Sequence, residues 1–131
     1  MNQWNRVFAT GSLLAGLAIV TGAFGAHGLE GKVSPEALET FEIGVRYQMY
    51  AALGLIGIAA MFRNSGSETR LARIGCQLLF WGTLIFSGTL FGIVAGGPKW
   101  LGAITPIGGS FQIIGWFLVS YTAMRQSSET K

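Results

Sequence analysis

The sequence has no aspartate, and among its 131 residues it has only one histidine, His27, and one cysteine, Cys76. A lone cysteine cannot form an intramolecular disulfide, which excludes a disulfide-stabilised secreted module. One histidine without nearby Cys or Asp falls short of the three or four ligands of a zinc site, and it supplies only one axial ligand for a haem. The sequence also shows no nucleophile–base pair and no phosphate-binding loop. We therefore expect no catalytic residues, no metal and no cofactor.

Charged residues are also scarce, at 11% of the chain, whereas a soluble domain spends about 25% of its residues on charge. Residues 7–29, 47–62, 74–98 and 100–124 contain no charged side chain, and hydrophobic residues make up 50% of the chain. A bilayer core needs about 20 apolar residues per helix. The composition therefore excludes a soluble enzyme and a disordered chain, and it predicts an all-α polytopic membrane protein, a bundle of four transmembrane helices.

The helices are predicted at about residues 4–26, 35–62, 68–96 and 101–124, as a single domain over 1–125, with a disordered tail at 126–131. Ser34-Pro35 reads as an N-cap followed by proline at the first helical position. Gly97-Pro98 should end the third helix. Thr105-Pro106 predicts an irregular start of the fourth helix with free amide donors, because proline removes a donor and clashes with the preceding turn.

The basic residues lie near the ends of the apolar runs, as topology signals do, and not in one patch with aromatic residues between them as in a nucleic-acid binder. Four spans place both termini and the central loop on one side. That side would hold Arg6, Arg63, Arg70, Arg73, Arg125 and Lys131, and the other side Lys32, Arg46 and Lys99. Because positive charge favours the cytoplasm, we expect a protein of the inner (plasma) membrane with both termini cytoplasmic. Trp4 and Tyr121 on one side, with Tyr47 and Trp100 on the other, suit interfacial aromatic belts.

Two predicted helices carry small residues at intervals of three or four. Association of helices in lipid depends on close backbone approach, which small residues permit. We therefore predict packing faces on the first and third helices: Gly11, Ala15 and Gly22, and Gly88, Gly92 and Gly96.

Polar residues are predicted to converge at the end of the bundle away from the termini. The apolar part of the second helix is too short to cross a bilayer alone, so its charged turns must enter the interface. Ionisable groups at such depth are costly and are candidates for function. We hypothesise an outward-open polar pocket formed by His27, Glu42, Arg46, Tyr47, Gln48, Ser87 and Thr105. Alternatively, Glu42–Arg46 is an anchoring ion pair, His27 a helix-end cap, Tyr47 a belt or core aromatic, and Gln48, Ser87 and Thr105 hydrogen-bond between helices.

Four segments carry a resemblance to a known family: GAFGAHGL (22–29), YQMYAAL (47–53), FSGTL (86–90) and GAITPIGG (102–109). Over nearly the whole chain, the sequence resembles the small bacterial inner-membrane proteins of domain of unknown function 423 (the UPF0382-like proteins), and more distantly eukaryotic transmembrane protein 256. The resemblance implies a four-helix membrane protein and no particular activity. Many relatives have histidine where this chain has Ala51, so any site that needs two histidines is excluded here.

Three hypotheses of function follow. The first is a non-enzymatic interaction or assembly protein that forms a homo-oligomer or joins a larger membrane complex through its glycine-rich faces, with membrane lipids as its surroundings. The second is a small transporter, channel subunit or binder of a lipid or other small ligand that uses the polar pocket. The third, an enzyme or haem-carrying subunit, has the least support, since only one histidine is available. A continuous polar path through the inner half would favour the second over the first, and the sequence offers little there beyond Cys76, Gln77 and Thr83.

Overall fold

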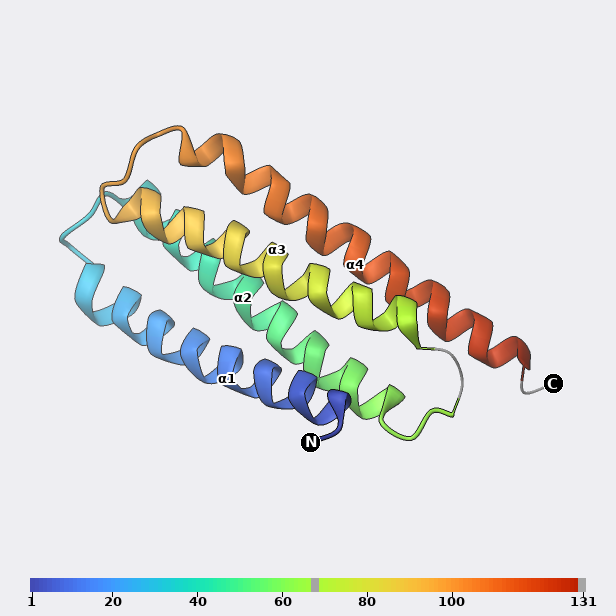
Figure 1. Cartoon of the computed structure of the whole chain (residues 1–131). Helices are drawn as coiled ribbons and strands as arrows, with labels where there is room; N and C mark the ends of the chain where they lie inside the picture. Colours follow the sequence, from blue (N-terminus) through green and yellow to red (C-terminus); the bar gives the residue numbers. More distant parts are fainter. Residues whose placement is uncertain (67–68, 130–131) are drawn as a thin grey trace.

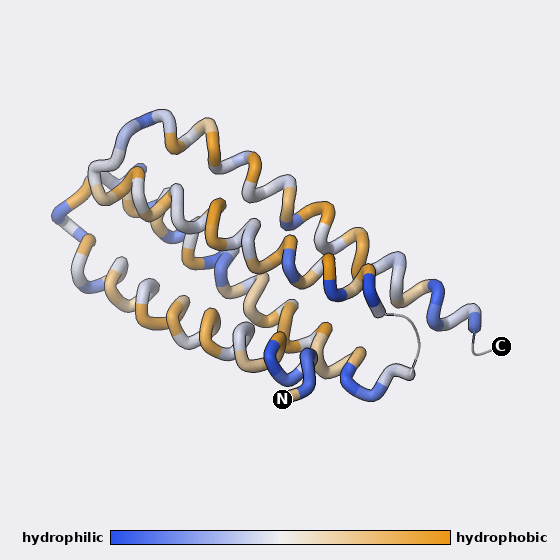
Figure 2. Tube along the Cα trace, in the orientation of Figure 1, coloured by the Kyte–Doolittle hydropathy of each residue, from blue (hydrophilic) through white to orange (hydrophobic). Residues whose placement is uncertain are grey.

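The computed structural model describes residues 1–66 and 69–129, which form four long helices, each antiparallel to the next along the chain (Figure 1). The elements are α1 (Gln3–Phe24), a π-helical turn η1 (Gly25–Leu29), α2 (Pro35–Phe62), α3 (Arg70–Val94) and α4 (Leu101–Glu129). These described ranges contain no β-strand. All four helices are long and apolar enough to cross a membrane, and the most hydrophilic segments gather toward their ends (Figure 2). The predicted fold class is confirmed.

Packing follows the order of the chain: α1 lies along α2, α2 along α3, and α3 along α4. The buried face of α2 serves two neighbours, because Gln48 contacts α1 and Gly44 contacts α3. Buried core residues from all four helices include Leu14, Leu55, Leu79 and Val119. The two termini and the central loop lie at one end of the molecule, and the other two loops lie at the opposite end (Figure 1).

Large apolar side chains cover the outside of the helices. Leu13, Ile19 and Phe117 are 64%, 66% and 70% exposed, which a soluble monomer would not tolerate over so wide a surface. Lipid is the medium in which such a surface is stable, because hydrocarbon is as apolar as these side chains. The exposed apolar surface is therefore what a membrane-spanning chain requires.

The helix ends explain two features of the sequence. The Ser34 hydroxyl accepts a hydrogen bond from the Ala37 N–H at 3.1 Å, and Pro35 begins α2. At the end of α3, Gly96 has a φ of +95°, the left-handed conformation that glycine adopts without strain. The Gly97 N–H donates to the Gly92 carbonyl at 2.8 Å, and the Gly96 N–H to Ile93 at 3.1 Å, which is a Schellman cap. The prediction of Gly96 as a helix-packing residue was wrong, because Gly96 terminates the helix.

The start and end of α4 differ from the prediction. Pro106 lies inside the helix, and the N–H groups of Leu101, Gly102 and Ala103 donate to the carbonyls of residues 98–100. These donors are therefore not free. At the other end, residues 126–129 continue α4, where Ser127 and Ser128 donate to carbonyls four residues back. The expected disorder was wrong for 126–129, and residues 130–131 lie outside the described ranges.

Trp4 was expected in an interfacial belt, and this expectation was wrong. Its side chain is 3% exposed and stacks on Phe62 of α2, with ring centroids 5.6 Å apart. The Asn2 side chain caps α1 by accepting from the Trp4 N–H at 2.9 Å. An aromatic residue near the end of a span therefore joins the core here. Tyr121 and Trp100 are exposed, as a belt requires.

Candidate functional site

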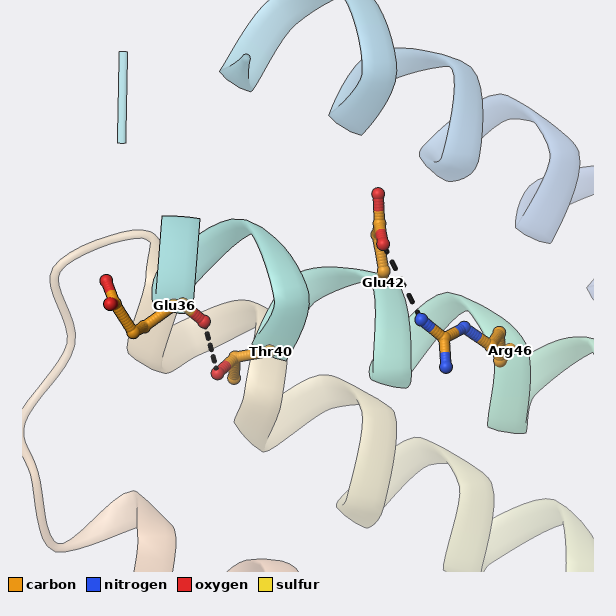
Figure 3. Close-up of polar contacts among 4 residues, drawn as sticks. All are labelled: Glu36, Thr40, Glu42 and Arg46. Atoms are coloured by element: carbon orange, nitrogen blue, oxygen red, sulfur yellow. Dashed lines mark hydrogen bonds and ion pairs between the residues drawn. The ribbon is translucent and has the colours of Figure 1, made fainter. Parts of the chain in front are cut away.

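The charged members of the predicted polar pocket lie on the outer surface of α2. Arg46 Nη2 and Glu42 Oε2 are 3.5 Å apart on successive turns, and both side chains are about half exposed (Figure 3). One turn earlier, the Thr40 hydroxyl donates to the Glu36 carbonyl at 3.0 Å (Figure 3). An exposed i, i+4 pair of this kind contributes about 0.3–0.5 kcal/mol. This geometry fits an anchoring ion pair near the membrane surface.

Three uncharged members are buried between helices, and each has a hydrogen-bond partner there. Gln48 donates to the Leu14 carbonyl of α1 at 3.0 Å, and Ser87 donates to the Gly44 carbonyl of α2 at 2.7 Å. The Thr105 hydroxyl lies 2.7 Å from that of Thr89. These three residues therefore join α1 to α2, α2 to α3, and α3 to α4.

His27 and Tyr47 are exposed, on different elements. His27 belongs to η1, where Gly25 leaves room for the ring of Phe41: a Cβ on Gly25 would lie 2.8 Å from that ring. Tyr47 packs against Phe86 of α3, with centroids 4.9 Å apart. Within residues 1–66 and 69–129, no hydrogen bond or ion pair joins His27 to Arg46 or Thr105. The structure thus disperses the seven residues over a surface pair, three helix interfaces and two exposed positions, and their common pocket stays a prediction.

The closest helix contact involves glycines that the sequence analysis did not select. Gly75 and Gly82 of α3 face Gly115 and Gly108 of α4, and a Cβ on any of the four would lie 2.7–2.8 Å from the carbonyl oxygen opposite. Within each helix the two glycines are seven residues apart, and antiparallel packing pairs them in reverse order. This seven-residue spacing was the signal available in the sequence.

The predicted glycine faces divide into one internal and one outward surface. Gly11 of α1 meets the Ala52 carbonyl of α2, and Gly22 meets Val45. Ala15 packs against the same core. The first face therefore serves α1–α2 packing. On α3, Gly88 is exposed with open space before it, and Gly92 contacts the Leu101 side chain.

A groove of about 640 Å³ opens between α1 and α3 at the end of the molecule that carries the termini. Leu55 of α2 contributes to its floor, Val7 and Thr10 come from α1, and Cys76 and Phe80 come from α3. Arg6, Arg70 and Arg73 line the same groove, together with Gln3, Gln77 and Ile74. None of the seven residues of the predicted pocket lines it.

The described lining of this groove carries three arginines and no acidic residue. Arg73 Nη1 donates to Gln3 Oε1 at 3.1 Å, a bond that connects α1 to α3 across the groove. From the sequence, these arginines were predicted only to be topology signals. The spacing of Gln3, Arg6 and Thr10, and of Arg73, Gln77 and Phe80, places each set on one helix face. That spacing does not show that the two faces oppose each other.

Comparison with known proteins gives the family. A family model described as "Protein of unknown function (DUF423)" matches residues 21–109. This chain is a member of the DUF423 family. A UPF0382 membrane protein of Staphylococcus epidermidis is 43% identical over 115 residues, which cover 88% of this chain and 92% of that protein. The UPF0382 membrane protein YwdK of Bacillus subtilis is 40% identical over 115 residues, covering 88% and 93% of the two chains.

The resemblance drawn from the four sequence segments is thus confirmed, and the relatives' names describe membrane proteins. No solved structure matches. The family match includes η1, the polar residues of α2 and Ser87, whereas all the α1 residues that line the groove precede residue 21. The chain is a small membrane protein of the DUF423 family.

Proposed function

We propose that this protein is a non-catalytic assembly protein of the plasma membrane that forms a homo-oligomer through the outer half of α3. The observation that carries the proposal is Gly88, a membrane-facing glycine whose absent side chain would meet nothing within 4 Å. Gly92 lies one turn further along and is half-buried. Elsewhere in this chain, at Gly75 and Gly82, glycines on the same helix mark close backbone approach. A second helix against Gly88 would gain equivalent packing contacts, which drive association in lipid.

The buried polar side chains support an assembly role over a transport role. Every buried side-chain nitrogen or oxygen of the described residues has a hydrogen-bond partner. In the inner half, Thr83 donates to the Leu79 carbonyl at 2.7 Å and accepts from Gln112 at 3.0 Å. Polar groups bonded in this way hold helices together and offer no continuous path for a solute.

A second candidate function, binding of a lipid or small ligand, is favoured by one specific observation. The groove between α1 and α3 has a charged mouth and an apolar floor, as ligand sites do. This site differs from the predicted pocket both in its residues and in the end of the molecule it occupies.

The expected orientation follows from the distribution of basic residues in the fold. Arg6, Arg63, Arg73 and Arg125 lie at the end with the termini, where Arg70 also lies, and Lys32, Arg46 and Lys99 lie toward the other end. We propose that the end with the termini faces the cytoplasm. Reporter fusions after Glu129 and within the central loop should both be active in the cytoplasm. Periplasmic activity at either position would reverse the assignment.

Oligomer formation tests the proposed function directly. Gly88→Leu should convert the protein, in bilayer nanodiscs or by cross-linking in membranes, from an oligomer to a folded monomer. Gly16→Leu is the matched control, because Gly16 on α1 is also exposed with open space before it. A monomeric wild-type protein, or equal loss of assembly in both variants, would contradict the proposal.

A further inference from the structure

We propose that the groove between α1 and α3 binds one anionic phospholipid from the leaflet on the side of the termini. Its phosphate would lie between Arg6 and Arg73, and an acyl chain would follow the apolar wall toward Phe80. The proposal does not depend on assembly through Gly88, because the groove and Gly88 lie toward opposite ends of α3.

The charge and geometry of the mouth suit a phosphate. Arg6 and Arg73 come from different helices and line one groove, whose described lining has no carboxylate. Arg73 uses one N–H to reach Gln3, and a guanidinium has five N–H donors in a rigid fork that fits phosphate oxygens. The bond to Gln3 holds the guanidinium in place. A phosphate between the two arginines would form charge-assisted hydrogen bonds, which are about twice as strong as neutral ones.

The depth of the groove suits a lipid better than a soluble anion. From Arg70 at the start of α3 to Phe80, ten residues rise about 15 Å, which extends from the headgroup level into the hydrocarbon. Along this distance the charged residues end at Arg6 and Arg73, and the deeper lining is uncharged: Val7, Thr10, Leu55, Ile74, Cys76, Gln77 and Phe80. A free phosphate would occupy only the mouth. A phospholipid would occupy both the mouth and the deeper part of the groove, since its charged headgroup lies at the membrane surface and its acyl chains extend into the hydrocarbon.

The groove does not continue through the molecule as an open path. Toward the opposite end, Phe41 of α2 packs against Phe24 of α1 and Phe91 of α3, with centroids 6.2 and 4.8 Å away. The described lining of the groove ends at Thr10 of α1 and Phe80 of α3, before this aromatic cluster. A dead-ended groove retains a lipid, and basic pockets between transmembrane helices on the cytoplasmic side are known to bind anionic headgroups.

The test is lipid retention measured by native mass spectrometry on the whole protein, with phosphatidylglycerol or phosphatidylcholine added at equal concentration. Wild-type protein should retain phosphatidylglycerol about tenfold better, because both lipids carry a phosphate but the choline group of phosphatidylcholine adds a cation that the arginines at the mouth repel. Arg6→Gln with Arg73→Gln should reduce this preference to less than about twofold. The matched control is Arg63→Gln with Arg125→Gln, which removes the same charge at the same end, outside the groove lining. It should retain the wild-type preference.

Two further measurements distinguish lipid binding in the groove from the alternatives. Ile74→Trp fills the groove from an exposed position without changing charge, and it should lower retention of phosphatidylglycerol even if the double arginine variant fails to fold. Inorganic phosphate at millimolar concentration should not displace the lipid. Displacement by phosphate, equal loss in the control, unchanged retention in Ile74→Trp, or a co-purifying polypeptide lost from the groove variants would each overturn the proposal.

Discussion

The two sides of α3 pack differently against their neighbouring helices. Toward α4, glycines at seven-residue spacing on both helices bring the backbones into contact. Toward α1, the facing side chains are long, including Arg6, Arg73 and Phe80, and the helices leave a groove between them. In lipid no hydrophobic drive closes such a gap, so contact depends on the shapes of the facing side chains. The same helix is therefore tightly paired on one side and open on the other.

The largest expected effect is at Gly108, where backbone meets backbone. A Cβ on Gly108 would lie 2.5 Å from the Phe86 nitrogen and 2.7 Å from the Gly82 oxygen, and backbone atoms cannot move aside locally. Gly108→Ala should lower the free energy of unfolding by at least about 2 kcal/mol, because overpacking of this kind costs about 1–3 kcal/mol or more. Thermal or denaturant unfolding in detergent or bicelles measures the change.

Gly109 provides the matched control for this prediction. A Cβ on Gly109 would lie 3.7 Å from the Phe86 ring, an ordinary contact distance. Gly109→Ala should leave stability unchanged or raise it by up to about 1 kcal/mol, because alanine is the better helix former. Equal destabilisation by the two substitutions would show that the close backbone contact at Gly108 is not what decides stability here.

A smaller effect is expected where α1 is attached to α2. Gln48→Met keeps the length of the side chain and removes its bond to the Leu14 carbonyl. Hydrogen bonds between membrane helices average about 0.6 kcal/mol and reach about 1.7 kcal/mol. Hydrogen exchange of α1 should therefore accelerate several-fold while that of α4 stays the same. Equal acceleration in both helices would mean that α1 and α4 unfold together. The close α3–α4 contact and the open α1–α3 groove would then not differ in local stability.

The smallest effect is expected at the surface pair on α2. Glu42→Gln with Arg46→Gln removes a 3.5 Å ion pair whose side chains are 52% and 54% exposed. Such pairs contribute little because water and salt screen them, so stability should fall by less than about 0.5 kcal/mol. Each single variant should behave like the double variant. A loss of several kcal/mol from Arg46→Gln alone would indicate a buried pair and would restore the predicted polar pocket.

The candidate sites were less predictable than the fold. Gln48, Ser87 and Thr105 were recognised from their types, and hydrogen bonding between helices was one of the two readings considered. Whether these side chains line a pocket or lie in a helix interface depends on the rotation of each helix about its axis. The identity of a single polar residue does not indicate that rotation. Arg6 and Arg73 were interpreted as topology signals because each lies at the end of an apolar run, and seventy residues of chain separate Gln3 from its partner Arg73. The sequence carries no local sign of that contact.

The sequence by itself determined that this chain is a four-span membrane protein. Charge costs several kcal/mol in hydrocarbon and each span needs about 20 apolar residues, so the runs without charge locate the helices one by one. The Ser34-Pro35 start of α2 and the Gly96-Gly97 cap of α3 act within a few residues, and they also follow from local rules. Which glycines meet a backbone, which polar side chains join helices and where a groove stays open were decided only by the tertiary structure. The physical reason is that these features depend on how four nearly uniform apolar helices rotate and slide against one another, and small differences in side-chain shape settle that arrangement.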